Sequence, residues 1–194
     1  MNSLSEVSLT EFKEALKPET IRVWEIIYLF LAISVLLFAA IVLAVLPNQP
    51  NELTGSGILN VVGIMTWINF ALLVVMIFVG KYISEKQYSK ENLQNAVNKN
   101  FTDKGGRIFA TTPAEKCLAI IRTSSILRLA TLESSAFFGI VIILLLKTNG
   151  EGQNAPIYYI NIVSVLPLLI YVISTFPTAE RLLEIFQTKF QQGL

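Results

Sequence analysis

The chain has 194 residues, of which 53% are hydrophobic and 15% are charged, and its formal net charge at pH 7 is +1. A soluble domain usually carries about 25% charged residues, so this composition disfavours an ordinary water-soluble domain. There is no His, and Cys117 is the only Cys. This excludes bis-His haem, His-ligated metal sites, a His general base and an internal disulfide.

Residues 1–20 are predicted to form a cytoplasmic amphipathic segment. Ser8 and Glu11 have the spacing of a capping box, in which each side chain accepts a hydrogen bond from the other residue's backbone N–H. The helix that follows carries its apolar side chains on one face: Leu9, Phe12 and Leu16. We expect this helix to lie at the membrane surface.

Four long apolar runs follow, at residues 21–46, 58–80, 125–146 and 157–176. Each has about the 20 residues that a helix needs to cross a bilayer. Each is apolar nearly all round, whereas a surface helix of a soluble protein is polar on one face. We therefore expect an all-α, polytopic membrane protein in which residues 21–177 form a four-transmembrane-helix bundle in the lipid bilayer.

The distribution of Lys and Arg predicts the orientation in the membrane. Of the 15 such residues, 13 lie before or at the start of the first run, between the second and third, or after the fourth. Lys147 lies between the third and fourth runs, and Arg128 lies inside the third. Lys and Arg collect on the cytoplasmic side, so both termini are expected there, including the tail at 178–194.

Residues 81–124 form the longest connection and are predicted to be a cytoplasmic helical hairpin. Thr112 and Glu115 have capping-box spacing around Pro113, so the third helix should begin there and continue to about residue 147. Such a helix is roughly 50 Å long, against a hydrocarbon core of about 30 Å, and should project into the cytoplasm. The second helix is expected to extend likewise toward Ala96.

A polar turn at 103–106 separates Phe101 from Ile108 and Phe109, and these flanks are predicted to pair as a short β-hairpin. The segment 81–124 as a whole has two interpretations. It is a solvated helical hairpin, or it is a docking surface for a cytoplasmic partner.

The third apolar run contains the residue with the clearest chemistry. Glu133 lies near its middle, where a charged side chain costs about 2.5–3.5 kcal/mol, so the carboxyl must be protonated, paired or facing water. One hypothesis is a proton- or cation-binding site that contains Glu133, Arg128, Asn69 and Asn161, with Ser164 as a further partner. The alternative is a hydrogen-bonded Glu133 that orients the bundle.

Thr131, Ser135 and Gly139 are spaced by four residues and form one small-residue face, which favours close helix packing. Glu133 is two residues from both Thr131 and Ser135, about 200° round the helix, so it should point away from this face. In the fourth run, Pro167 predicts a kink.

Residues 127–146, with Glu133 among them, resemble the carboxyl-bearing helix of rotary ATPase c-subunit proteolipids. This resemblance implies that Glu133 is an ion carrier. Residues 115–122, 127–133 and 176–181 carry a second resemblance, which extends over most of the chain, to a family of uncharacterised small four-span bacterial inner-membrane proteins. That resemblance implies the topology and the bacterial inner membrane, and no activity.

The sequence lacks a Walker loop, a dinucleotide-binding glycine fingerprint, a Gly-x-Ser-x-Gly elbow and a His-Glu-x-x-His motif. We therefore expect no enzymatic activity, no cofactor, no metal site and no nucleic-acid partner. The first hypothesis is a non-enzymatic structural or accessory subunit of a membrane complex, forming a homo-oligomer or assembling with other membrane subunits. The second is an oligomeric protein that translocates protons or cations through Glu133.

Overall fold

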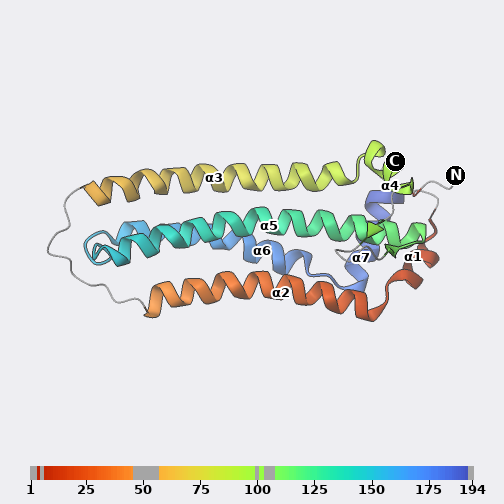
Figure 1. Cartoon of the computed structure of the whole chain (residues 1–194), viewed down its shortest axis with the longest axis horizontal. Helices are drawn as coiled ribbons and strands as arrows, with labels where there is room; N and C mark the ends of the chain where they lie inside the picture. The colour runs from red at the N-terminus through yellow and green to blue at the C-terminus, as the bar shows by residue number, and fades with distance from the viewer. Residues whose placement is uncertain (1–3, 5–6, 46–56, 99–100, 103–107, 192–194) are drawn as a thin grey trace. The chain divides into compact units, whose positions relative to one another are not determined.

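The structure is a computed structural model that describes residue 4 and residues 7–45, 57–98, 101–102 and 108–191. The described elements are, in chain order, α1 (Leu9–Ala15), α2 (Pro18–Ala40), η2 (Ile41–Val45), α3 (Gly57–Gln87), α4 (Lys90–Asn98), β1 (Phe101–Thr102), β2 (Ile108–Ala110), α5 (Pro113–Thr148), η3 (Pro156–Ser164), α6 (Val165–Thr175), α7 (Ala179–Phe186) and η4 (Gln187–Gln191). Here η2 and η4 are π-helical turns and η3 is a 3₁₀ helix. Figure 1 shows α2, α3 and α5 as the long helices.

Among the described residues, four helical stretches are long and apolar enough to cross a membrane: Pro18–Ala44, Gly57–Gln87, Pro113–Thr148 and Pro156–Thr175. Their mean hydropathy runs from 3.0 in the first to 2.0 in the fourth. They coincide with the four apolar runs of the sequence. The multi-pass, helical character of the protein is therefore confirmed.

The chain forms two compact units. Unit 1 comprises Met1–Tyr28, Lys81–Arg128 and Thr175–Leu194, and unit 2 comprises Leu29–Gly80 and Leu129–Ser174. The helices α2, α3 and α5 each contribute one part to unit 1 and the other part to unit 2.

In unit 1, aromatic rings join the two ends of the chain. The rings of Phe12 in α1 and Phe186 in α7 stack with centroids 4.1 Å apart, and Phe186 lies 5.5 Å from Phe190. Tyr88 meets Phe190 edge to face at 5.8 Å. The capping box of Ser8 and Glu11 is present, as predicted. The apolar side chain Phe12, however, is covered by the C-terminal segment, where the sequence suggested a membrane surface.

The start of α5 agrees with its prediction. The Glu115 N–H donates to the Thr112 hydroxyl at 3.2 Å, and the Glu115 carboxylate accepts from the Thr112 N–H at 3.2 Å. The carboxylate also accepts from the backbone N–H of Thr111 at 2.9 Å. The helix then continues without interruption for 36 residues. The uninterrupted length is consistent with the absence of Pro between Pro113 and Thr148.

The second helix is shorter at its C-terminal end than the sequence suggested. It ends at Gln87, and α4 begins at Lys90 as a separate helix. The Asn92 side chain donates to the Gln87 carbonyl at 3.1 Å, and this satisfies a backbone group that the interrupted helix leaves free. Beyond α4, β1 pairs antiparallel with β2, which confirms the predicted pairing, whereas the predicted turn at 103–106 lies outside the described residues.

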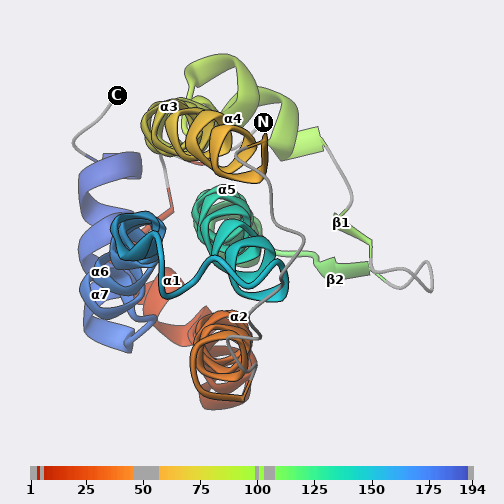
Figure 2. The same ribbon diagram turned by 90° about the vertical axis from the view of Figure 1, so that its left-hand side faces the viewer.

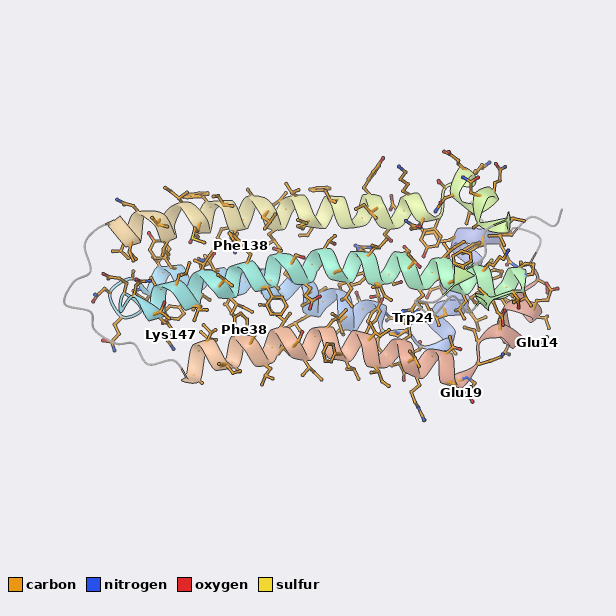
Figure 3. All side chains as sticks on the ribbon, viewed as in Figure 1. Glu14, Glu19, Trp24, Phe38, Phe138 and Lys147 are labelled. Atoms are coloured by element: carbon orange, nitrogen blue, oxygen red, sulfur yellow. The ribbon has the colours of Figure 1, made fainter. Side chains whose placement is uncertain are left out.

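In unit 2, side chains of α5 contact α2 and the π-helical turn η2. Figure 2 shows the end-on view, with the ribbon of α2 on one side of α5 and that of α3 on the other. Phe137 packs against Phe38 with ring centroids 5.6 Å apart. Near the end of α5, Lys147 is 4% exposed and its Nζ donates to the Leu43 carbonyl at 2.7 Å. Figure 3 labels Phe38 and Lys147 on these two helices. A buried ammonium that meets a helix-end carbonyl is favoured both by the hydrogen bond and by the helix dipole.

The fourth apolar run is not one kinked helix. Pro156–Ser164 form the 3₁₀ helix η3, and α6 begins at Val165. This break places Pro167 in the first turn of α6, where the missing N–H leaves no intrahelical bond unmade. In η3, the Ser164 hydroxyl donates to the Asn161 carbonyl at 2.8 Å, a local bond that competes with regular α-helical pairing.

The aromatic stack gives a first prediction. We expect Phe186→Ala to destabilise unit 1 by about 3–5 kcal/mol, because it removes a fully buried ring from between Phe12 and Phe190. Tyr82→Ala is the matched control, since Tyr82 is 66% exposed and should change stability by less than about 0.5 kcal/mol. Thermal unfolding of the full chain in detergent, followed with limited proteolysis, measures both variants. Equal effects would contradict the packing described.

Candidate functional site: an interhelical polar cluster

A cluster of polar side chains lies between α3, α5 and η3 in unit 2. We call it the interhelical polar cluster and define it by five residues: Thr66, Asn69, Ser135, Asn161 and Ser164. Asn69, Ser135, Asn161 and Ser164 are all 0% exposed, and Thr66 is half-buried. Polar side chains this deep in apolar helices require partners, so their hydrogen bonds decide what the cluster can do.

Each hydrogen bond of the cluster has a defined donor and acceptor. Asn161 donates through Nδ2 to the Tyr158 carbonyl at 2.8 Å and to the Thr66 hydroxyl at 2.9 Å. A carbonyl accepts only, so the Asn161 amide orientation is fixed and its Oδ1 must accept. It accepts from Asn69 Nδ2 at 3.0 Å. The Thr66 hydroxyl in turn donates a hydrogen bond to the Val62 carbonyl at 2.8 Å. The cluster therefore joins α3 to η3 by two side-chain bonds, one at Asn69 and one at Thr66.

Gly139 brings α5 against this cluster. A Cβ added at Gly139 would overlap the Ser164 hydroxyl, and it would lie 2.5 Å from the Asn161 carbonyl oxygen and 3.1 Å from Asn69 Nδ2. Only a residue without a side chain allows so close an approach. Ser135, one turn earlier on the same face of α5, is fully buried. Ser135 and Gly139 thus lie on a buried face of α5.

Two oxygen atoms of the cluster remain without a hydrogen bond among the described residues. They are Asn69 Oδ1 and Ser135 Oγ, both buried. The orientation of Asn69 follows from the chain of donors through Asn161, so Oδ1 is the atom left over. The cluster thus combines a satisfied network with spare acceptor capacity at two neutral oxygens.

Glu133 is not part of this cluster. It is half-buried, and its Oε1 lies 3.5 Å from the hydroxyl of Ser34 in α2. The same hydroxyl has a closer acceptor, the Leu31 carbonyl at 2.9 Å, and a hydroxyl has only one proton to donate. The contact with Glu133 is therefore the weaker of the two.

The structure brings together Asn69 and Asn161, which the sequence singled out as partners for Glu133, but it joins them to each other. Arg128 and Thr131 are half-buried on α5, and both make further interactions. Arg128 belongs to unit 1, whereas Glu133 belongs to unit 2.

In unit 2, sequence reasoning missed the polar contacts of Ser34, Thr66 and Lys147 that are described above. Ser34 and Thr66 are single hydroxyl residues in apolar helices, and their spacing gave no signal. Lys147 was predicted only to lie where the third helix ends and the connection to the fourth run begins. Its burial depends on the Leu43 carbonyl, which lies 104 positions away in the chain.

The chemistry of the cluster is that of helix association. Interhelical hydrogen bonds in membrane proteins contribute about 0.6–2 kcal/mol each, and the small residue at the contact adds close van der Waals packing. The five side chains of the cluster are amides and hydroxyls, and none of them is an acid or base that could activate a hydroxyl as a nucleophile. No grouping of three or more His, Cys, Asp or Glu that could hold a metal ion occurs among the described residues.

No family model matches the chain, and no curated protein and no solved structure matches it either. The resemblances to four-span bacterial membrane proteins and to rotary ATPase proteolipids therefore stay hypotheses.

The glycine contact gives a second prediction. Gly139→Ala should destabilise the protein by about 1–3 kcal/mol, because the new methyl group meets the backbone and side chains of η3. Gly57→Ala is the matched control, since a Cβ there has no atom within 4 Å and the residue is the first of α3, so stability should change by less than about 0.5 kcal/mol. Thermal unfolding in detergent should therefore shift to lower temperature for Gly139→Ala and stay nearly unchanged for Gly57→Ala. A neutral Gly139→Ala would refute the close approach.

Proposed function

We propose that the protein is a non-enzymatic accessory subunit of a bacterial inner-membrane complex. In this proposal, unit 2 forms a four-helix bundle in the bilayer and unit 1 lies on the cytoplasmic side with both termini. Unit 1 is the docking part.

The distribution of charge between the two units is the observation that carries the proposal. The division into two units follows from the packing of the backbone and does not depend on charge. All but one of the 15 Lys and Arg residues nevertheless belong to unit 1. Lys147 is the exception, and it is buried against a backbone carbonyl. A part of the protein that carries almost no cationic side chain suits the bilayer, and the part that collects them suits the cytoplasmic face.

The exposed surface of unit 2 supports the same assignment. Large apolar side chains point away from the protein on its helices, among them Phe30 at 70%, Trp67 at 79% and Ile173 at 76% exposed. Contiguous apolar exposure of this kind marks a membrane or protein interface. Four buried polar side chains of unit 2, Asn69, Ser135, Asn161 and Ser164, lie by contrast in the interhelical polar cluster.

Unit 1 supports the docking role because it is a folded module and not a loose hairpin. Leu93 and Ala96 of α4 are buried, whereas Glu91, Gln94 and Asn95 on its other face are exposed. The hydroxyls of Ser84 and Ser124 lie 2.6 Å apart and connect α3 to α5 in this unit. A partner would therefore meet a preformed polar surface on α4.

A second candidate function rests on Glu133. A half-buried carboxyl in an apolar helix, with a single weak contact from Ser34, suits an exchangeable proton or cation. In that case the protein is an oligomer that translocates the ion, and Arg128 tunes the site. The interhelical polar cluster would then serve only to hold the helices that present Glu133.

The docking role predicts a specific crosslink. A photoreactive benzoylphenylalanine at Gln94, on the exposed face of α4, should crosslink to another protein in native membranes. The same probe at Trp67, an exposed apolar position of unit 2, is the control and should give mainly lipid adducts. The adduct masses are read by mass spectrometry. Adducts restricted to a second copy of this chain would favour a homo-oligomer, and an absence of protein adducts at Gln94 would overturn the docking role.

Glu133→Gln separates the two candidate functions. As an accessory subunit, the wild-type protein in liposomes should conduct no protons or Na⁺, and the variant should assemble normally. If Glu133 is the ion carrier, the wild type conducts and the variant loses at least about tenfold of the flux while keeping its assembly. A pH-sensitive dye inside the liposomes measures the flux. Ser34→Ala is the control for local packing, since it removes the neighbouring hydroxyl without touching the carboxyl.

A further inference from the structure

A groove of mixed polarity lies in unit 1 beside the first turns of α2 and α5. It consists of a cavity of about 560 Å³ and a smaller one of about 140 Å³, which share Thr20, Ala119 and Arg122 in their walls. The combined groove falls within the roughly 300–1,000 Å³ typical of small-molecule sites. It is distinct from the interhelical polar cluster, which belongs to unit 2.

Both signs of charge line the groove. Lys17 and Arg122 contribute two cations, and Glu19 and Glu115 contribute two carboxylates. The Glu115 carboxylate already accepts hydrogen bonds at the start of α5. Within the described residues, Arg122 and Glu19 form neither an ion pair nor a side-chain hydrogen bond. The groove therefore offers a guanidinium, an ammonium and a carboxylate to a ligand.

The polarity changes along the groove. In α2, Glu19 and Thr20 line the groove and Val23 follows about one turn later. In α5, Glu115 comes first, Leu118 and Ala119 form an apolar wall, and Arg122 and Thr123 precede Ile126. Figure 3 places Glu19 at the start of α2, before Trp24. Both helices run from this end into their apolar segments, so residue number rises toward the bilayer in each. All four charged side chains of the groove thus precede Val23 or Ile126, the apolar residues at the end that points to the hydrocarbon.

We propose that this groove binds one phospholipid of the cytoplasmic leaflet, with a zwitterionic headgroup that carries both a phosphodiester and a primary ammonium. Arg122 and Lys17 bind the phosphate, because the planar guanidinium fork matches phosphate oxygens. The Glu19 carboxylate binds the ammonium and disfavours a purely anionic headgroup. Val23 and Ile126 contact the start of the acyl chains. The inference rests on the membrane placement under the proposed function, which the crosslinks at Gln94 and Trp67 test separately.

Native mass spectrometry of the delipidated full chain in detergent tests the lipid. The probes are phosphatidylethanolamine and phosphatidylglycerol with identical acyl chains. We expect the wild type to prefer phosphatidylethanolamine, and Arg122→Gln to weaken both lipids by about tenfold or more, since a charge-assisted hydrogen bond is lost. Glu19→Gln should weaken phosphatidylethanolamine alone and remove the preference.

The matched controls are Arg22→Gln and Glu14→Gln, exposed residues of α2 and α1 that do not line the groove and should leave binding unchanged. Unchanged affinity in Arg122→Gln, or an unchanged preference in Glu19→Gln, would overturn the site. Water-soluble glycerophosphoethanolamine distinguishes the source of the headgroup. If it competes as well as the full lipid, the groove binds a free phosphodiester and the lipid assignment is wrong.

Discussion

The close approach of η3 to α5 at Gly139 is the constraint on which unit 2 depends. With a hydrogen atom in place of a side chain, α5 lies directly against the Asn161 carbonyl and the Ser164 hydroxyl. That proximity encloses Asn69 and Asn161, and enclosure excludes competing donors from their mutual bond. In apolar surroundings such a bond is retained because, among the described residues, Asn69 is the side chain that donates to the Asn161 Oδ1. The 3₁₀ winding of η3 presents both the Asn161 carbonyl and its side chain toward α3 and α5.

The parts of the fold that the sequence predicted well are those set by local chemistry. The helix start at Pro113, the capping boxes of Ser8 and Thr112, and the four apolar stretches all follow from residues within a few positions of one another. The break before Pro167 was predicted only as a kink, because whether a Pro bends a helix or begins one depends on how the preceding residues are satisfied. Here the side chains of Asn161 and Ser164 donate to backbone carbonyls three residues earlier, and these local bonds favour the 3₁₀ segment before Pro167.

The candidate site was predicted as a set of residues but not as an arrangement. Asn69 and Asn161 are 92 positions apart, and nothing local in the sequence specifies that they pair with each other instead of with Glu133. The helical face of Gly139 was predictable from the spacing of small residues. The neighbour of Glu133 was not, because Ser34 lies 99 positions away in a helix whose rotation only tertiary packing sets. Polar pairing between distant helices is therefore the part of this protein that composition and periodicity leave open.

The burial of Lys147 has a practical consequence for mapping the topology of this protein. It is the only Lys or Arg of unit 2, and its amine is held by the Leu43 carbonyl with 4% of the residue exposed. Amine-reactive reagents and trypsin will therefore report almost nothing from this part of the chain, whichever side of the membrane it faces. Cysteine scanning avoids the problem, because the only native thiol, Cys117, is fully buried in unit 1 and gives a silent background. Accessibility from the two sides of the membrane can then be read one introduced thiol at a time.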